Sequence, residues 1–167
     1  MKKNLIGKFL TFIFNGDKSN ISGIVLSYND DWTLIRRCND YLIDGYVIIR
    51  NNTYSKYVQG EYELRAMKIL TLKKYDYLNE PVIPISNLDN IIEYISKKHI
   101  LFSLDVKDGD AFDVLKFKNK INEKYNLDEL MPNGNFRNLL CFSKTVFRVI
   151  SFDTDYMNSL KLITNFD

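Results

Sequence analysis

The fold class of the N-terminal half is decided by residues 21–38, which read ISGIVLSYNDDWTLIRRC. Apolar, β-branched and aromatic residues fill most of positions 21–28 and 32–38, as is usual for strands on a half-buried pleated surface. Asn29, Asp30 and Asp31 separate the two runs, and such residues favour turns because their side chains hydrogen-bond to the nearby backbone. The stretch therefore predicts two strands joined by a tight turn.

The same pattern continues on both sides of this stretch. Residues 5–14 form an apolar run that ends at the turn Asn15-Gly16-Asp17, and residues 46–50 form another that ends at Asn51-Asn52. Four strands within about fifty residues, joined by short polar turns, are typical of a small barrel. The residues expected in its core, from their alternating positions, are Leu26, Leu34, Val47 and Ile49.

The middle of the chain changes to a helical pattern. Apolar residues recur at helical spacing over 61–72 and again over 88–97, where Ser86 is a suitable N-cap. Residues 73–84 are polar and contain proline, which predicts a linker. We interpret residues 59–98 as a helical connection.

Strand patterns return in the C-terminal part. The expected strands are 99–106, 112–117, 121–127, 136–142 and 146–152, and Asp155 begins a short C-terminal helix. The sequence thus predicts a mainly β fold of two small SH3-like barrels. Its expected domains are a barrel at 1–58, the helical connection at 59–98, and a second small barrel with the terminal helix at 99–167.

Composition agrees with this prediction. Of the 167 residues, 46% are hydrophobic and 26% charged, which excludes a disordered chain. Eleven Phe and eleven Tyr residues against two alanines favour strands over helices. The net charge of +2 is too small to indicate a nucleic acid or an acidic membrane. Cys38 and Cys141 are expected to be free, mostly buried thiols of a cytoplasmic protein.

Two motifs in the N-terminal strands resemble those of the Sm-like family of small β-barrels. The first runs from Gly7-Lys8-Phe9 through Gly16 to residues 23–34, where glycine, alternating apolar residues, an aromatic residue, aspartate and a large apolar residue keep the family's spacing. The second is GYVIIRNNTY at 45–54, which is similar to the family's apolar strand ending in Ile-Arg-Gly. The resemblance covers about residues 6–58 and implies an Sm-like barrel there.

The resemblance also implies a binding site with altered residues. In Sm-like RNA binders a large residue stacks on a base, an Asn beside it binds the base edge, and Arg and Gly close the pocket. Trp32 and Arg50 match the stacking and closing positions, whereas Thr33, Asn51 and Asn29 stand where the family has Asn, Gly and Asp. Thr33 lacks the paired donor and acceptor that read a base edge. The resemblance therefore supports the fold more than RNA binding, and a structural role for Trp32 is preferred over a base platform.

A second candidate surface lies in the C-terminal half. Lys116, Lys118 and Lys120 alternate along one expected strand, which places them on one face near Tyr125. A basic strand face beside an aromatic ring is typical of a nucleic-acid platform. Lysines also protect an exposed edge strand from pairing with another chain, and this second interpretation is preferred.

Catalytic and metal-binding patterns are not recognisable in the sequence. His99 is the single histidine and no nucleophile motif accompanies it, so we expect a partly exposed residue at a strand end. The acidic run from Asp105 to Asp113 fails the register of a calcium loop, because Lys107 and Gly109 stand where oxygen ligands are needed. The sequence predicts a non-enzymatic protein without cofactor or metal.

These observations favour a protein that acts by binding. The first hypothesis is a protein–protein interaction or self-assembly module that forms a homo-oligomer, because Sm-like barrels pair through exposed edge strands. The alternative is an RNA-binding protein, supported by Trp32, Arg50 and the lysine-bearing strand. A membrane is not expected as partner, since the apolar stretch at 5–14 is far shorter than a membrane span.

Overall fold

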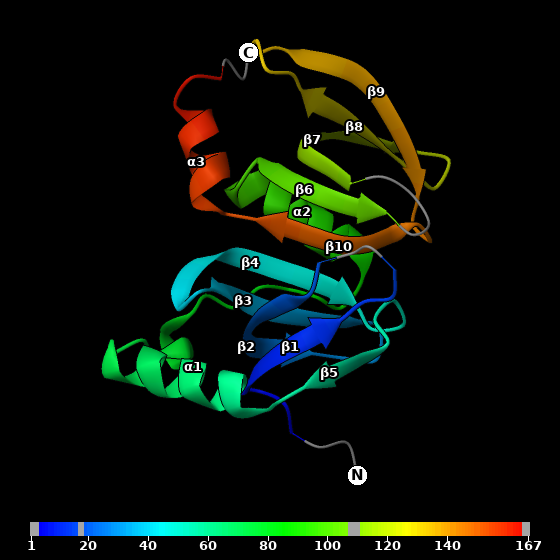
Figure 1. Cartoon of the computed structure of the whole chain (residues 1–167). Coiled ribbons are helices and arrows are strands. Elements are labelled where there is room, and N and C mark those ends of the chain that lie inside the picture. Colours follow the sequence, from blue (N-terminus) through cyan, green and yellow to red (C-terminus); the bar gives the residue numbers. More distant parts are fainter. Residues whose placement is uncertain (1–3, 17–18, 107–110, 165–167) are drawn as a thin grey trace. The chain divides into compact units, whose positions relative to one another are not determined.

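The computed structural model describes residues 4–16, 19–106 and 111–164. The chain divides into two compact units, residues 1–85 and 86–167 (Figure 1). Antiparallel strands predominate over helices among the described residues of each unit, so the mainly β class expected from the sequence is confirmed.

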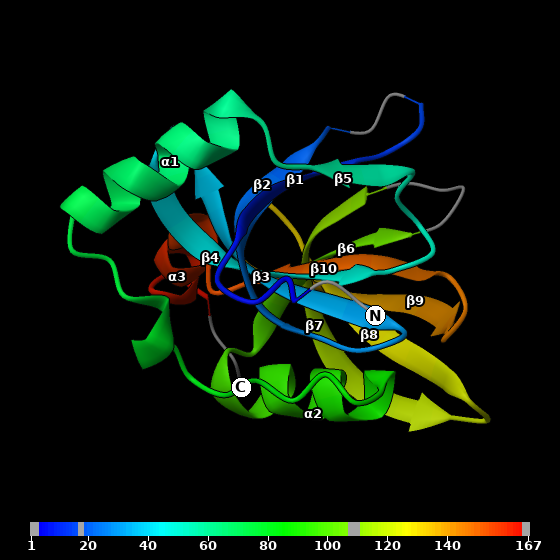
Figure 2. The ribbon, with the colours of Figure 1, turned by 90° about the horizontal axis from the view of Figure 1, so that it is seen from below.

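Unit 1 contains five strands in the spatial order β5-β1-β2-β3-β4. The strands are β1 (Phe9–Ile13), β2 (Ile21–Tyr28), β3 (Trp32–Asn39), β4 (Leu42–Arg50) and β5 (Lys56–Val58). Helix α1 (Glu61–Leu72) follows them and lies along one face of the sheet (Figure 2). A 3-10 turn, η1 (Tyr77–Asn79), lies in the segment that was expected to be a linker.

The closed barrel expected for residues 1–58 is wrong, because the sheet of unit 1 is open. β5 pairs with β1, and among the described residues no pairing joins β5 to β4. A barrel fills its interior with side chains of its own strands, whereas here a helix supplies the second layer. Ala66 and Leu70 of α1 pack with Phe9, Ile24 and Cys38 of the sheet, so the sheet buries this face without closing on itself.

The expected core residues of unit 1 are largely confirmed. Leu34, Val47 and Ile49 are buried, while Leu26 is half-buried. Gly23 is required for the close approach of β2 and β3, because a Cβ atom there would lie 2.2 Å from the carbonyl oxygen of Arg36.

Unit 2 contains the other five strands in the order β10-β6-β7-β8-β9. The elements are α2 (Leu88–Lys98), β6 (Leu101–Val106), β7 (Ala111–Ile121), β8 (Lys124–Leu130), β9 (Phe136–Ser143), β10 (Phe147–Phe152) and α3 (Asp155–Lys161). The last strand, β10, returns to lie beside β6 (Figure 1). The sheet is open here too, since within the described residues β9 pairs only with β8, so the second expected barrel is also wrong.

Helices α2 and α3 complete the core of unit 2. Four residues of α2 are buried, namely Leu88, Ile91, Ile92 and Ile95, which confirms the expected apolar face. The N-cap of α2 is Asn87 rather than Ser86, because the Asn87 side chain accepts the backbone N–H of Asn90. Met157 of α3 packs with Leu101 and Val114, so the C-terminal helix begins at Asp155 as expected and is part of the core.

Candidate functional site

The two Sm-like positions on β3 and β4 are brought together in unit 1, but in a buried arrangement. Trp32 and Arg50 are cross-strand partners in the β3–β4 register. The side chain of Trp32 is 2% exposed, and the Arg50 guanidinium lies 4.8 Å from the centre of its ring. Base stacking needs an open ring face. The burial of Trp32 therefore favours the structural role.

The polar residues of the same site are engaged with one another. Thr33 donates its hydroxyl hydrogen to Oδ1 of Asn51 over 2.6 Å. The Asn51 amide in turn donates to the backbone carbonyl oxygens of Asn29 and Asp30, at 2.8 and 3.1 Å. Asn51 thus fastens the β2–β3 turn to the end of β4, at the position where the Sm-like family has glycine.

The side chain of Asn29 also holds this turn through hydrogen bonds. Its Oδ1 accepts the backbone N–H groups of Asp31 and Trp32 at 2.9 and 2.8 Å, and its Nδ2 donates to the carbonyl oxygen of Ile85 at 2.7 Å. An Asp at this position has no such donor. The three departures from the Sm-like pattern therefore form a hydrogen-bond network that holds the turn.

The three lysines of β7 do not share one open face. A bulge between Phe117 and Asn119 interrupts the alternation of the strand. Lys120 reaches Asp89 of α2 at 3.0 Å and lies 5.2 Å from the ring of Tyr125. Hydrogen bonds from Tyr125 and Lys120 lower the pKa of Asp89, so this contact is an ion pair.

The other two lysines have different partners. The ammonium nitrogen of Lys116 lies 4.7 Å from the ring centre of Phe136, and that of Lys118 lies 3.5 Å from Oδ1 of Asp128. β7 is also an interior strand between β6 and β8, so the interpretation of these lysines as protection of an edge is wrong. Each lysine of the set has its own contact within unit 2, which weakens the case for a basic platform.

His99 lies at the C-cap of α2 rather than at the strand end expected from the sequence, and 15% of its side chain is exposed. Its Nδ1 lies 3.5 Å from Oδ1 of Asp153, and its ring packs on Tyr94 and Phe152. Burial lowers the pKa of His99, while Asp153 opposes this shift. These contacts hold α2 against the end of β10 and supply no nucleophile.

Metal-ligating side chains and thiols were the other groups to consider. No group of three or more His, Cys, Asp or Glu side chains that could hold a metal occurs in the described part of the chain, and Asp108 and Asp110 lie outside that part. Cys38 is buried and free as expected, whereas Cys141 is free but exposed, which corrects its expected burial.

The sequence did not reveal an apolar surface on unit 1. Three large aliphatic side chains, Ile6, Leu78 and Val82, are 47%, 76% and 92% exposed, and all three line one pocket of about 290 Å³. Its other apolar lining residues are Leu26, Leu34, Pro81 and Ile83. We call these seven residues, with the pocket that they line, the 78–82 surface. The signal available in the sequence was limited to two aliphatic residues, Leu78 and Val82, within the segment expected to be a polar linker.

The 78–82 surface is held in place by Glu80. The hydroxyl group of Tyr75 donates to Oε1 of Glu80 at 2.6 Å, Tyr46 donates to Oε2, and Nε of Arg36 lies 3.3 Å from Oε1. Burial, followed by this hydrogen bond to Glu80, strongly raises the pKa of Tyr75, so its hydroxyl stays protonated at ordinary pH. Leu78 and Val82 are therefore presented from a fixed backbone.

The ring of Tyr77 fixes the same segment to the N-terminal residues. A Cβ atom on Gly7 would lie 2.6 Å from the Tyr77 hydroxyl oxygen, and the φ angle of Gly7 is +78°. Only glycine fits both conditions without strain.

Comparison with known proteins gave no match. The chain matches no protein-family model, no curated protein and no solved structure. None of the helices in the described ranges is long and apolar enough to cross a membrane.

Proposed function

We propose that this chain is a non-enzymatic, cytoplasmic self-assembly module that binds a second copy of itself through the 78–82 surface. The observation that carries the proposal is the exposure of Leu78 and Val82 beside a pocket with an apolar lining. Contiguous exposed apolar residues on a folded unit mark interaction sites. Two unpaired cysteines agree with a reducing compartment.

The shape of the surface suits a two-fold contact. In an isologous dimer the same patch serves both subunits, so it must offer both a projection and a hollow. Leu78 and Val82 project from the surface, and the hollow beside them is lined by Leu26, Leu34 and Ile83. Burying a Leu or Val side chain contributes about 1.5–3 kcal/mol, and the net charge of +2 gives little repulsion between copies.

The fixed backbone of this segment favours association with a second copy. A binding surface that is ordered before association loses less conformational entropy when the partner arrives. Glu80 is anchored by Tyr75, Tyr46 and Arg36 between the two projecting residues, so the segment from 75 to 82 does not have to fold on binding.

RNA binding through the Sm-like positions remains the alternative hypothesis. The burial of Trp32 and the Thr33–Asn51 hydrogen bond weigh against it, because both remove groups that would contact a base. No contact among the described residues specifically favours RNA.

Sedimentation velocity over a wide range of protein concentration tests the proposal. The wild-type chain should shift from monomer to dimer as concentration rises, and Leu78→Asp should remain a monomer. Leu72→Asp is the matched control, because Leu72 on α1 is 74% exposed, close to the 76% of Leu78, yet it does not line the pocket. A wild-type chain that stays monomeric, or equal effects of both variants, would refute the proposal.

A further inference from the structure

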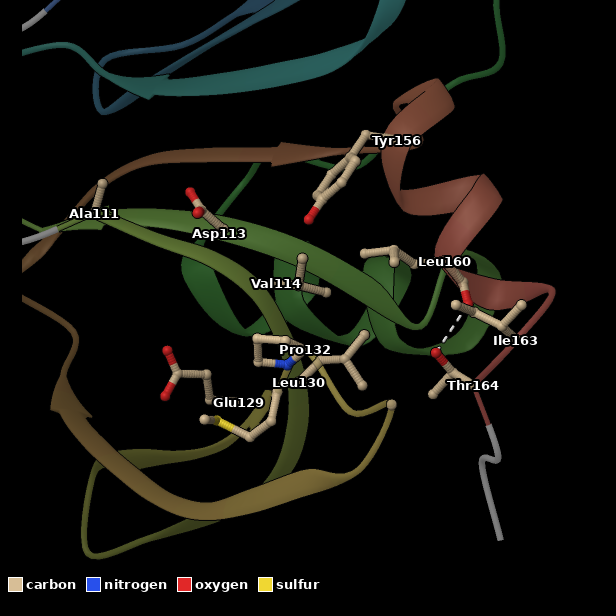
Figure 3. A pocket seen from close by; sticks show the side chains of 12 residues that line it. Ala111, Asp113, Val114, Glu129, Leu130, Pro132, Tyr156, Leu160, Ile163 and Thr164 are labelled. Carbon is tan, nitrogen blue, oxygen red and sulfur yellow. Dashed lines mark hydrogen bonds between the residues drawn. The ribbon is translucent and has the colours of Figure 1, made fainter.

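Unit 2 has a pocket of about 320 Å³ that is independent of the 78–82 surface (Figure 3). It lies between the beginning of β7, the end of β8 with the loop that follows, and α3 with the residues after it. The volume is that of a small-molecule site rather than of a packing defect.

The apolar part of the pocket is built on the core of unit 2. Val114 is 4% exposed and belongs to the cluster with Leu101 and Met157, and Leu130 and Leu160 pack against that cluster. Because these side chains are held by the core, this part of the pocket is formed before any ligand binds. Ile163, which is 74% exposed, adds an aliphatic wall on the open side.

Polar groups complete the lining of the pocket. Figure 3 shows the hydroxyl group of Tyr156 directed inward from α3, with the carboxylates of Asp113 and Glu129 across the pocket from Ile163. Glu129 forms an ion pair with Arg137, so its charge is balanced. Asp113 thus supplies the negative charge of the pocket lining.

We infer that this pocket binds a small amphiphilic organic ammonium ion. Its aliphatic or aromatic body lies on Val114, Leu130 and Leu160, and its ammonium group lies near Asp113 with the Tyr156 hydroxyl as a further acceptor. Charge decides between ligand classes here, because a carboxylate ligand of the same size would face Asp113 with like charge. The inference shares no residue with the 78–82 surface and does not depend on self-assembly.

Nuclear magnetic resonance titration of the full chain tests this inference. The probes are hexylammonium, hexanol and hexanoate, which have the same chain length and differ in charge. Hexylammonium should shift the signals of Val114 and Leu160 and bind more tightly than hexanol, whereas hexanoate should bind weakest. Absence of shifts in the pocket with all three probes, or equal binding of hexanoate and hexylammonium, would overturn the inference.

Substitutions at two exposed residues test the charged contact and the apolar contact of the ligand separately. Asp113→Asn should weaken hexylammonium binding roughly fivefold, which corresponds to about 1 kcal/mol, and leave hexanol binding unchanged. Ile163→Ser should weaken both ligands alike. The charge control is Glu123→Gln, because Glu123 is 75% exposed in the same unit and does not line the pocket. Equal effects of Asp113→Asn and Glu123→Gln would contradict the inference.

Discussion

The guanidinium of Arg50 lies 4.8 Å from the centre of the Trp32 ring, on the neighbouring strand of the same sheet. This cation–π contact covers the indole at the position where an Sm-like RNA binder keeps its stacking residue exposed. The pair therefore stabilises unit 1, and Trp32, which suggested RNA recognition, is part of its core.

Tryptophan fluorescence tests this role directly, since Trp32 is the only tryptophan. We expect the emission to be insensitive to oligo-U and oligo-A at moderate salt, because the ring is 2% exposed. Saturable quenching by an oligonucleotide that is abolished in Arg50→Ala would instead support RNA binding.

Leu34 is 1% exposed on β3, so Leu34→Ala should lower the free energy of unfolding by about 2–5 kcal/mol. Urea denaturation measures this loss. Leu78→Ala is the control, because Leu78 is 76% exposed and its truncation should change the stability of the monomer by less than about 0.5 kcal/mol. A loss at Leu34 well under 1 kcal/mol would mean that β3 has another register.

The Asn51 side chain forms two hydrogen bonds to the β2–β3 turn and accepts a third from Thr33 of β3. Asn51→Ala leaves Thr33 without its partner and should cost about 1–3 kcal/mol in chemical denaturation. The exposed neighbour Asn52 is the matched control, and Asn52→Ala should have a small effect. Equal losses for both variants would show that the network does not hold the turn.

Stability should depend on pH through His99, the single histidine. Because burial lowers the pKa of His99 in the folded chain below its ordinary value of about 6.5, the unfolded chain binds more protons just below that pH. The histidine's contribution is therefore complete above about pH 6.5 and declines as pH falls towards the lowered value.

Thermal unfolding from pH 7.5 downwards checks this dependence, and His99→Phe is the control because it keeps a ring beside Phe152. The variant should lose the step between about pH 6.5 and the lower pKa, while the carboxylates titrate further down. An identical pH profile for both proteins would contradict the role given to His99.

Local patterns predicted most elements, but closure of the sheet was not predictable from them. The apolar runs at 21–28 and 32–38 correspond to β2 and β3, and α1 occupies 61–72 as expected. Barrel closure depends on whether β5 meets β4, which is a contact between strands distant in sequence, and no local pattern encodes it. Because α1 packs on the apolar face of the sheet, that face is buried although the sheet does not close.

Two hairpins were placed inaccurately for a local reason. Asp40 and Tyr41, and again Asn122 and Glu123, adopt positive φ angles at two-residue turns. Such turns usually contain glycine, and glycine is absent from both pairs. The strand expected at 46–50 therefore begins earlier, at Leu42, and the strand expected at 121–127 begins later, at Lys124.

The candidate site was only partly predictable. The pairing of β3 with β4 brings Trp32 and Thr33 beside Arg50, and Asn51, the residue directly after β4, bonds to Thr33, so the four expected site residues do lie together. Their burial and mutual hydrogen bonds depend on side-chain packing, which the spacing does not reveal. The 78–82 surface as a whole was not predictable, because it is assembled from three separate segments around residues 6, 26–34 and 78–83.

Paramagnetic relaxation enhancement between copies tests most directly whether two copies meet through the 78–82 surface. Isotope-labelled wild-type chain is mixed with unlabelled chain that carries a nitroxide on Asn79→Cys, in a Cys141→Ser background because Cys141 is the exposed native thiol. We predict broadening of the Leu26 and Leu34 signals in the labelled copy, with those of Leu64 on α1 unchanged. Unbroadened signals throughout the labelled copy, or broadening centred on α1, would contradict the claim.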